Sequence, residues 1–184
     1  MKKHNRRKRR GSQLEMYSPH SLYGKLKEFG GSRLKSHPKR HRPIELNKNL
    51  HLVLKSSRAT GKFSMKTMYN FSVVKGFVYS LAARFKVKIV RFENVGNHLH
   101  IVLMVSSQKA YVSFIRGVTS SIARHITGAK KQNELGIKFW DARPYSRIIT
   151  WGRDLKNIFI YLNRNRIQAI GFDLFVKEQL QLSG

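Results

Sequence analysis

The chain has 184 residues, the length of one domain with a substantial hydrophobic core. It carries 37 Lys and Arg against 9 Asp and Glu, a formal net charge of +28, which favours a polyanionic partner, with nucleic acid ahead of an anionic membrane surface. The absence of cysteine excludes a disulfide framework, a thiolate metal site and a cysteine nucleophile. No apolar run approaches the length of a membrane span and no apolar segment follows the basic first residues, so we expect a cytoplasmic protein without a membrane partner.

Residues 1–45 form a predicted basic N-terminal arm. Residues 2–10 are a run of like charge, which we expect to be flexible until it meets an anion. Residues 33–42 are a second basic cluster with the composition of an irregular linker. Residues 21–29, between the two clusters, are compatible with a short helix. Residues 46–184 are then predicted to form a single domain.

The pattern after the arm predicts strands and helices in alternation. Residues 50–54 are a first apolar strand. Ser64 is a predicted N-cap, and the helix after it runs to about Phe85 on three- and four-residue apolar spacing. Residues 86–92 alternate as a half-buried strand does, and residues 95–97 form a tight turn into the next strand.

The second half continues with another strand and two helices. The strand that begins at His98 is apolar on both faces after its first residues, which is normal for an interior strand. An amphipathic helix is predicted over residues 108–126, a strand over 147–151 and a last helix over 153–169, for which Gly171 is a suitable C-terminal stop. This order predicts an α+β fold: a ferredoxin-like β-α-β-β-α-β antiparallel sheet covered by helices on one face, with an additional C-terminal helix.

His98 and His100 lie at the start of the apolar strand. Strand side chains alternate between faces, so both imidazoles point the same way. Buried polar rings need partners, and neutral imidazole is the commonest metal ligand in proteins. Two histidines on one face can therefore share a cation. Most histidine pairs with this spacing are structural or face solvent, so the metal hypothesis depends on the rest of the chain.

Tyr161 and Asn165 are four residues apart on the last predicted helix. This spacing places them on one face, one turn from each other, beside an apolar stripe. A tyrosine in such a position more often lies at the edge of the core with its hydroxyl in water, and an asparagine more often caps a helix end. The pair alone therefore does not establish a catalytic role.

Taken together, these motifs resemble a known family. The motifs are Asn-His-Leu-His at residues 97–100, Phe-Trp at 139–140, Ser-Arg-Ile-Ile at 146–149 and Tyr-Leu-Asn-Arg-Asn-Arg-Ile at 161–167. Over roughly residues 49–171 the chain resembles the single-tyrosine HUH transposases, and in particular their REP-associated tyrosine transposase branch. It departs from the family pattern at Arg166 and Gly96, where proline is usual, and in a spacing to Gly171 that is one residue longer. Neither proline position supplies a reacting atom.

The resemblance implies a metal-dependent enzyme that cleaves and rejoins single-stranded DNA. Residues 46–184 would be an HUH-type catalytic domain in which Tyr161 is the nucleophile and forms a 5′-phosphotyrosine. A phenol has a pKa of about 10, so it needs a cation that polarises the phosphate. His98 and His100, with Asn165 as third ligand, would bind Mg²⁺ or Mn²⁺. The scattered carboxylates fit this chemistry better than a two-metal carboxylate nuclease.

The remaining basic surface is expected to bind DNA, and the resemblance implies a hairpin-forming single strand as the partner. Arg143, Tyr145 and Arg147 are expected near the entrance of the site, where they would stack on or pair with bases. Basic side chains that could follow phosphates elsewhere are Arg116, Arg124, Lys130 and Lys131. Each of these side chains could equally belong to a solvated face.

Three functions are open at this point. The first is a DNA strand-transfer enzyme; the second is a non-enzymatic nucleic-acid-binding protein with a decayed site; the third is a basic ribosome-associated protein. Relatives in the family include both intertwined dimers and monomers, and we expect a monomer.

Overall fold

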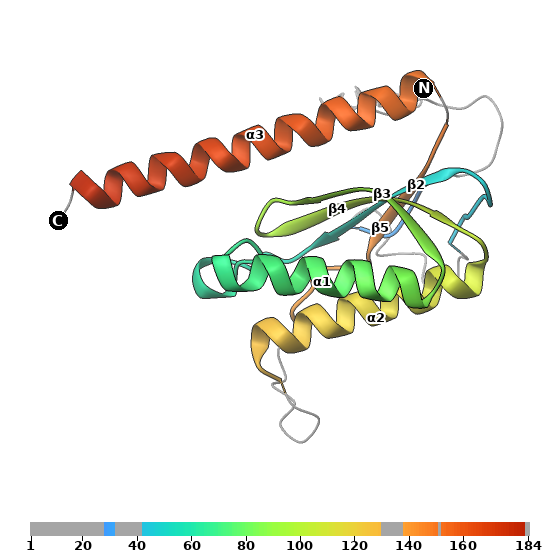
Figure 1. The fold of residues 1–184 in the computed structure, drawn as a ribbon, viewed down its shortest axis with the longest axis horizontal. Helices are drawn as coiled ribbons and strands as arrows, with labels where there is room; N and C mark the ends of the chain where they lie inside the picture. Colours follow the sequence, from blue (N-terminus) through green and yellow to red (C-terminus); the bar gives the residue numbers. More distant parts are fainter. Residues whose placement is uncertain (1–27, 32–41, 130–137, 151, 183–184) are drawn as a thin grey trace, which may run out of the picture.

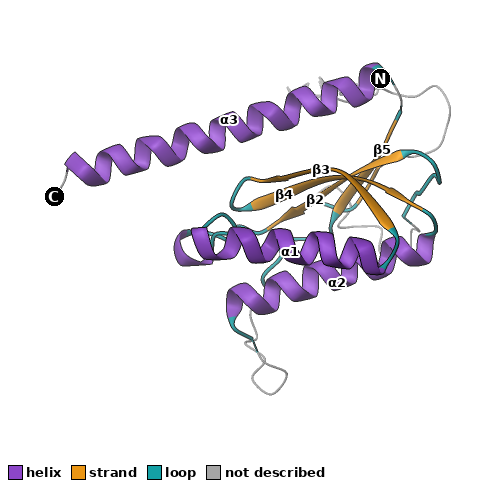
Figure 2. Ribbon diagram, viewed as in Figure 1, coloured by secondary structure: helices purple, strands orange, loops and turns teal. Residues whose placement is uncertain are grey.

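A computed structural model describes residues 28–31, 42–129, 138–150 and 152–182 of the chain. Its strands are β1 (Glu28–Phe29), β2 (Asn49–Lys55), β3 (Val87–Asn94), β4 (His98–Val105) and β5 (Tyr145–Ile149). Its helices are the 3₁₀ turn η3 (Gly61–Phe63), α1 (Met68–Arg84), α2 (Gln108–Thr127) and α3 (Arg153–Leu182). Figures 1 and 2 show these elements as a sheet between two layers of helix.

The five strands form one antiparallel sheet in the order β1-β5-β2-β4-β3. From β2 to β5 the elements follow the predicted order β-α-β-β-α-β, so the α+β class is confirmed. Two interior strands, β2 and β4, are almost wholly buried, which explains why their sequences are apolar on both faces.

Helices α1 and α2 cover one face of the sheet (Figure 1). Their apolar stripes bury Val74 and Val78 of α1 and Phe114 and Val118 of α2 against Ile101 and its neighbours on the strands, forming the main core. Thr67 caps α1 by accepting a hydrogen bond from the Asn70 amide, and Ser107 caps α2 in the same way at Ala110.

Helix α3 lies on the opposite face of the sheet (Figure 1), where a second, smaller apolar cluster holds it. Ile158 and Leu162 of α3 pack on Val102 of β4 and Ile149 of β5. Arg91 of β3 adds a polar attachment by donating to the side chain of Asn163. The sheet is thus a layer between two helical faces rather than a sheet with one solvated side.

Strand β1 is a feature that the sequence did not predict. Residues 28–29 were expected to be compatible with a helix, yet they pair with β5 and add an edge strand to the sheet. Arg42 fixes this region because its guanidinium donates to the Pro144 carbonyl at 2.9 Å and stands 4.4 Å from the centre of the Phe29 ring. Part of the predicted basic arm therefore belongs to the folded domain, while residues 1–27 and 32–41 lie outside the described residues.

The ends of two helices also differ from prediction. Ser64 follows η3 instead of capping a helix, and α1 begins only after Thr67, because the backbone first makes a 3₁₀ turn. Helix α3 continues to Leu182 instead of stopping at Gly171. A glycine inside a helix costs only about 0.5–1 kcal/mol relative to alanine, which is too little to end a helix by itself. The last predicted strand ends at Ile149, and Trp151 lies outside the described residues.

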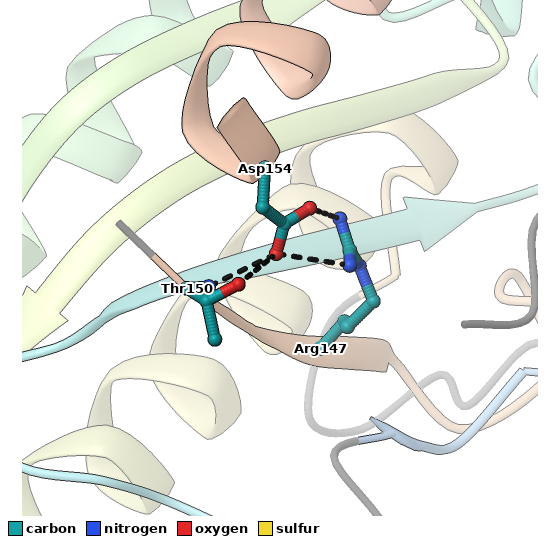
Figure 3. Close-up of polar contacts among 3 residues, drawn as sticks. All are labelled: Arg147, Thr150 and Asp154. Atoms are coloured by element: carbon teal, nitrogen blue, oxygen red, sulfur yellow. Dashed lines mark hydrogen bonds and ion pairs between the residues drawn. The ribbon is translucent and has the colours of Figure 1, made fainter. Parts of the chain in front are cut away.

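An ion pair at the start of α3 ties this helix to β5 (Figure 3). The Arg147 guanidinium donates to both carboxylate oxygens of Asp154, at 2.9 and 3.3 Å. The amide and hydroxyl of Thr150 donate to the same carboxylate at 2.9 and 3.0 Å. Burial disfavours ionisation of Asp154, but these four hydrogen bonds outweigh it and hold the pKa of the carboxyl below its usual range.

None of the described helices is long and apolar enough to cross a bilayer.

We predict that Asp154→Ala lowers the free energy of unfolding by about 1.5–3 kcal/mol at pH 7, the range for hydrogen bonds to a charged group. Because the folded-state pKa of Asp154 is lowered, its stabilisation is complete above the unfolded pKa of about 3.9 and disappears as the pH falls through the folded value. Urea denaturation of both proteins from pH 7 to pH 3 measures this difference.

The control is Glu45→Ala, which removes an exposed ion pair with Lys48 whose side chains are 39% and 40% accessible. Such a pair contributes about 0–1 kcal/mol. Equal losses in the two variants, or a loss in Asp154→Ala that does not depend on pH, would contradict a special role for the carboxylate.

Candidate active site

The two histidines at the start of β4 lie on the face of the sheet that α3 covers. As predicted, their side chains point to the same side, and their ring centres are 4.7 Å apart with the planes nearly perpendicular. His100 is buried at 2% exposure, whereas His98 is half-buried at the entrance of the strand. Asn97, in the preceding turn, lies 2.6 Å from the His98 Nδ1 through its side-chain oxygen and so fixes that ring.

Helix α3 brings the predicted tyrosine and asparagine to these histidines. Ile158 and Leu162 are buried against the sheet, which turns the adjoining face of the helix toward β4. The Tyr161 ring meets the His100 ring edge-on at 5.6 Å between centres, and the Asn165 Nδ2 lies 3.4 Å from the His100 Nε2. Tyr161 stays 45% exposed, so its hydroxyl is open to a ligand.

A third histidine, His51 of β2, belongs to the same cluster, although sequence reasoning did not place it there. Its Nε2 lies 3.1 Å from the His100 Nδ1, and the two rings stack at 5.3 Å with 17° between planes. His51 is 4% exposed. The available signal was a lone imidazole in the apolar run of residues 50–54, because a buried polar ring requires a partner on a neighbouring strand.

All three imidazoles are held neutral. Burial keeps the pKa of His100 far below its usual range, and the neighbouring rings of His51 and His98 lower this pKa further. Burial and the cationic Arg147 lower the pKa of His51, and burial and Lys55 lower the pKa of His98. A neutral imidazole keeps a lone pair, so these rings are suited to bind a cation rather than to donate a proton.

The side chains around His100 fit a divalent cation. Two neighbouring ligands of an octahedral cation such as Mg²⁺ lie about 3 Å apart, since each bond is about 2.1 Å. The amide group of Asn165 and the Nε2 of His100 are separated by 3.4 Å, and rotation of the amide presents its oxygen instead of its nitrogen. Within the described ranges, no group of three His, Cys, Asp or Glu side chains is placed to share a metal.

A cavity of about 790 Å³ opens beside this cluster. Tyr161, His98 and His100 form one part of its wall. Three residues predicted near the entrance of the site, Arg143, Tyr145 and Arg147, line it as well. The Gly30–Gly31 turn after β1 forms a further part, and a side chain at Gly30 would collide with the Pro144 carbonyl, at 2.1 Å from the added carbon.

The other predicted DNA-binding residues lie elsewhere. Arg116 and Arg124 are exposed on α2, which packs on the opposite face of the sheet from Tyr161 (Figure 1). Lys130 and Lys131 lie outside the described residues. The Arg147 guanidinium forms an ion pair with Asp154, so the first turn of α3 fixes its position in the cavity.

Comparison with known proteins agrees with the resemblance. A search of curated proteins finds no significant match. Among solved structures, a REP-associated tyrosine transposase bound to a REP hairpin matches with a TM-score of 0.55 and 13% sequence identity over 71% of this chain and 73% of its own, which is a likeness of fold. A candidate transposase from Deinococcus radiodurans R1 matches with a TM-score of 0.44 and 17% identity over 70% of this chain and 98% of its own.

The family model described as "Transposase IS200 like" matches residues 47–165, a segment that begins just before β2 and ends on α3 at Asn165. It contains β2, both strand histidines and Tyr161, and it spans well over half of the chain. The chain therefore belongs to the IS200-like transposase family.

Proposed function

We propose that this protein cleaves single-stranded DNA and transfers the cut end to another strand, with Tyr161 as the nucleophile. The observation that carries the proposal is the convergence of four side chains. His98 and His100 from β4 and Tyr161 from α3 line one cavity, and Asn165, one turn further along α3, lies 3.4 Å from the His100 Nε2. Membership of the IS200-like transposase family supports the same reaction.

In the cleavage step the Tyr161 hydroxyl oxygen attacks the scissile phosphorus. A bond forms between this oxygen and phosphorus, and the bond from phosphorus to the 3′ oxygen breaks. The phenol loses one proton and the leaving 3′ oxygen gains one, so a 3′-hydroxyl is released. The product is a 5′-phosphotyrosine. Attack by a second 3′-hydroxyl reverses these bond changes, joins the strands and restores the tyrosine. The number and type of phosphoester bonds are conserved, so no ATP is required.

His98, His100 and the amide oxygen of Asn165 would hold the divalent cation, Mg²⁺ or Mn²⁺. Such a cation supplies Lewis-acid polarisation of the scissile phosphate and stabilises the charge that builds on it. Asn165 lies one helical turn after Tyr161, so a single rigid helix sets the distance between the nucleophile and the cation site.

The substrate that we propose is a single strand that folds into a hairpin. The structural relative of similar fold was solved with a REP hairpin, and the net charge of +28 suits a polyanion. In the cavity, Tyr145 offers a ring for base stacking and Arg143 a cation, next to the catalytic side chains. Arg116, Arg124, Lys130 and Lys131 would contact phosphates outside it.

One copy of the chain supplies every proposed catalytic group. Tyr161 reaches His100 of its own sheet, at 5.6 Å between ring centres, so no second subunit is needed to complete the site. This arrangement supports a functional monomer. The strand order β5-β2-β4-β3 fits the finer fold assignment that we propose, a ferredoxin-like domain over residues 46–184 to which β1 adds an edge strand and α3 an additional helix.

We predict that Tyr161→Phe abolishes formation of a covalent protein–DNA adduct and leaves hairpin binding intact, because only the attacking oxygen is lost. The measurement is a denaturing gel of the protein after incubation with labelled hairpin DNA from the flanks of its own gene, with Mn²⁺ or Mg²⁺. Tyr79→Phe is the matched control, since Tyr79 has the same 45% exposure but lies on α1 across the sheet.

An adduct that persists in Tyr161→Phe would assign the attack to another group. Tight hairpin binding by the natural protein without an adduct or a nick in either metal would favour a nucleic-acid-binding protein that does not cleave. Co-sedimentation with ribosomes and no preference for hairpins would favour the ribosome-associated alternative.

We predict that His98→Ala and Asn165→Ala raise the Mn²⁺ concentration needed for half-maximal adduct formation at least about tenfold, because each removes a ligand atom. Adduct formation should also stop when EDTA removes the metal and resume when Mn²⁺ is restored. His125→Ala is the control: this histidine contacts Asn70 on the α1–α2 face, with 3.1 Å between its Nε2 and the Asn70 oxygen. An unchanged Mn²⁺ requirement in both site variants would exclude these residues as ligands.

A further inference from the structure

We propose that His51 is a positioning residue that fixes the tautomer of His100, so that the His100 Nε2 is available as a ligand. His51 also lines the cavity, but its Nε2 is directed at the His100 ring and not at the proposed cation. It would act only through its hydrogen bond to His100, whose Nδ1 lies 3.1 Å from the His51 Nε2. The role of this contact in cleavage rests on the function proposed above, but the tautomer itself does not.

The two rings are held together by the sheet. In the β2–β4 pairing, His51 lies opposite Val102 and Val53 lies opposite His100, so the histidines are diagonal neighbours on the same face. Both are almost fully buried, at 4% and 2% exposure, and their rings stack with 17° between planes. If either ring turned away, a buried nitrogen would lose its hydrogen-bond partner, which is costly.

A neutral imidazole carries one N–H and one bare nitrogen, and the bond made by one nitrogen decides the state of the other. If the His100 Nδ1 carries the proton and donates it to His51, the His100 Nε2 keeps its lone pair. The opposite arrangement, with His51 as donor, would place the proton on the His100 Nε2 and block it as a ligand.

The side of His100 that faces α3 favours the first arrangement. The Asn165 Nδ2, a donor group, faces the His100 Nε2 at 3.4 Å, as expected if that nitrogen is bare and accepts. A ligand histidine ordinarily donates its second ring N–H to an outer partner, which fixes the ring and its tautomer. In this protein the outer partner is a second imidazole, and its Nε2 accepts the bond.

Two substitutions separate the acceptor from the ring. His51→Phe keeps a flat ring against His100 but removes the acceptor, whereas His51→Gln keeps a side-chain oxygen that can accept from the His100 Nδ1–H. We expect His51→Phe to weaken Mn²⁺ binding by about 10–100-fold and His51→Gln to restore most of it. Mn²⁺ binding to the full chain is measured without DNA, by the electron paramagnetic resonance signal of the free ion, with His125→Phe as the control variant.

The tautomer is read directly by ¹⁵N NMR of the histidine rings in the metal-free protein. We expect the His100 proton on Nδ1 in the natural chain and in His51→Gln, and on Nε2 or exchanging in His51→Phe. A proton on the His100 Nε2 of the natural chain overturns the inference, and so does Mn²⁺ binding by folded His51→Phe at the natural affinity. If His51→Phe does not fold, the tautomer of the natural chain and the affinity of His51→Gln decide.

Failure of the proposed function has a different signature. In that case Tyr161→Phe would still form the adduct, while the tautomer and the effect of His51 on Mn²⁺ affinity would be unaffected. Conversely, an adduct that requires Tyr161 and metal, with an Mn²⁺ affinity that ignores His51, would keep the function and remove the positioning role.

Discussion

The attachment of α3 to the sheet is the constraint on which the candidate site depends. Strand β4 fixes His98 and His100 within a five-stranded sheet, but Tyr161 and Asn165 belong to a helix that is joined to β5 by a short connection in which Gly152 has a φ of 81°. The helix is held by a few apolar side chains, the Arg147–Asp154 pair and Arg91. Because helices are rigid and backbone connections are not, these contacts determine where the nucleophile lies.

The histidine pair in the interior imposes a second constraint. His51 and His100 lie on two neighbouring interior strands, where apolar side chains would fill the same space without any need for polar partners. The pair is tolerated because each ring satisfies the other and Asn165 satisfies the outer nitrogen of His100. Such a network is stable only when every member is present, so it couples the sheet, β2 as well as β4, to the position of α3.

The strands and helices from β2 to α3, and the faces on which the four candidate site residues lie, could be predicted from the sequence because they depend on short-range periodicity. Period-two alternation placed His98 and His100 on one face of their strand, and helical spacing placed Tyr161 and Asn165 on one face of their helix. Contacts between elements could not be predicted in this way: the register of β2 on β4 brings His51 to His100, and the edge strand β1 forms only because β5 offers it a free edge. The predicted helix end at Gly171 is wrong, because the free-energy cost of a glycine inside a helix is smaller than the stabilisation from the further turns of α3.

The neutral ligands that we propose for the cation agree with the charge of the whole chain. A carboxylate in the metal site would cancel part of the charge of a divalent cation, whereas two imidazoles and an amide leave it undiminished. The phosphate of a DNA strand would then meet the full charge of the cation, in a cavity where Arg143 and Lys55 add to the positive potential while Arg147 and Asp154 neutralise each other. Three of the 9 acidic residues, Glu28, Asp141 and Asp154, line this cavity, but Asp154 is paired with Arg147 and Asp141 accepts hydrogen bonds from Ser57, so these two carboxylates are already occupied by partners of the chain itself.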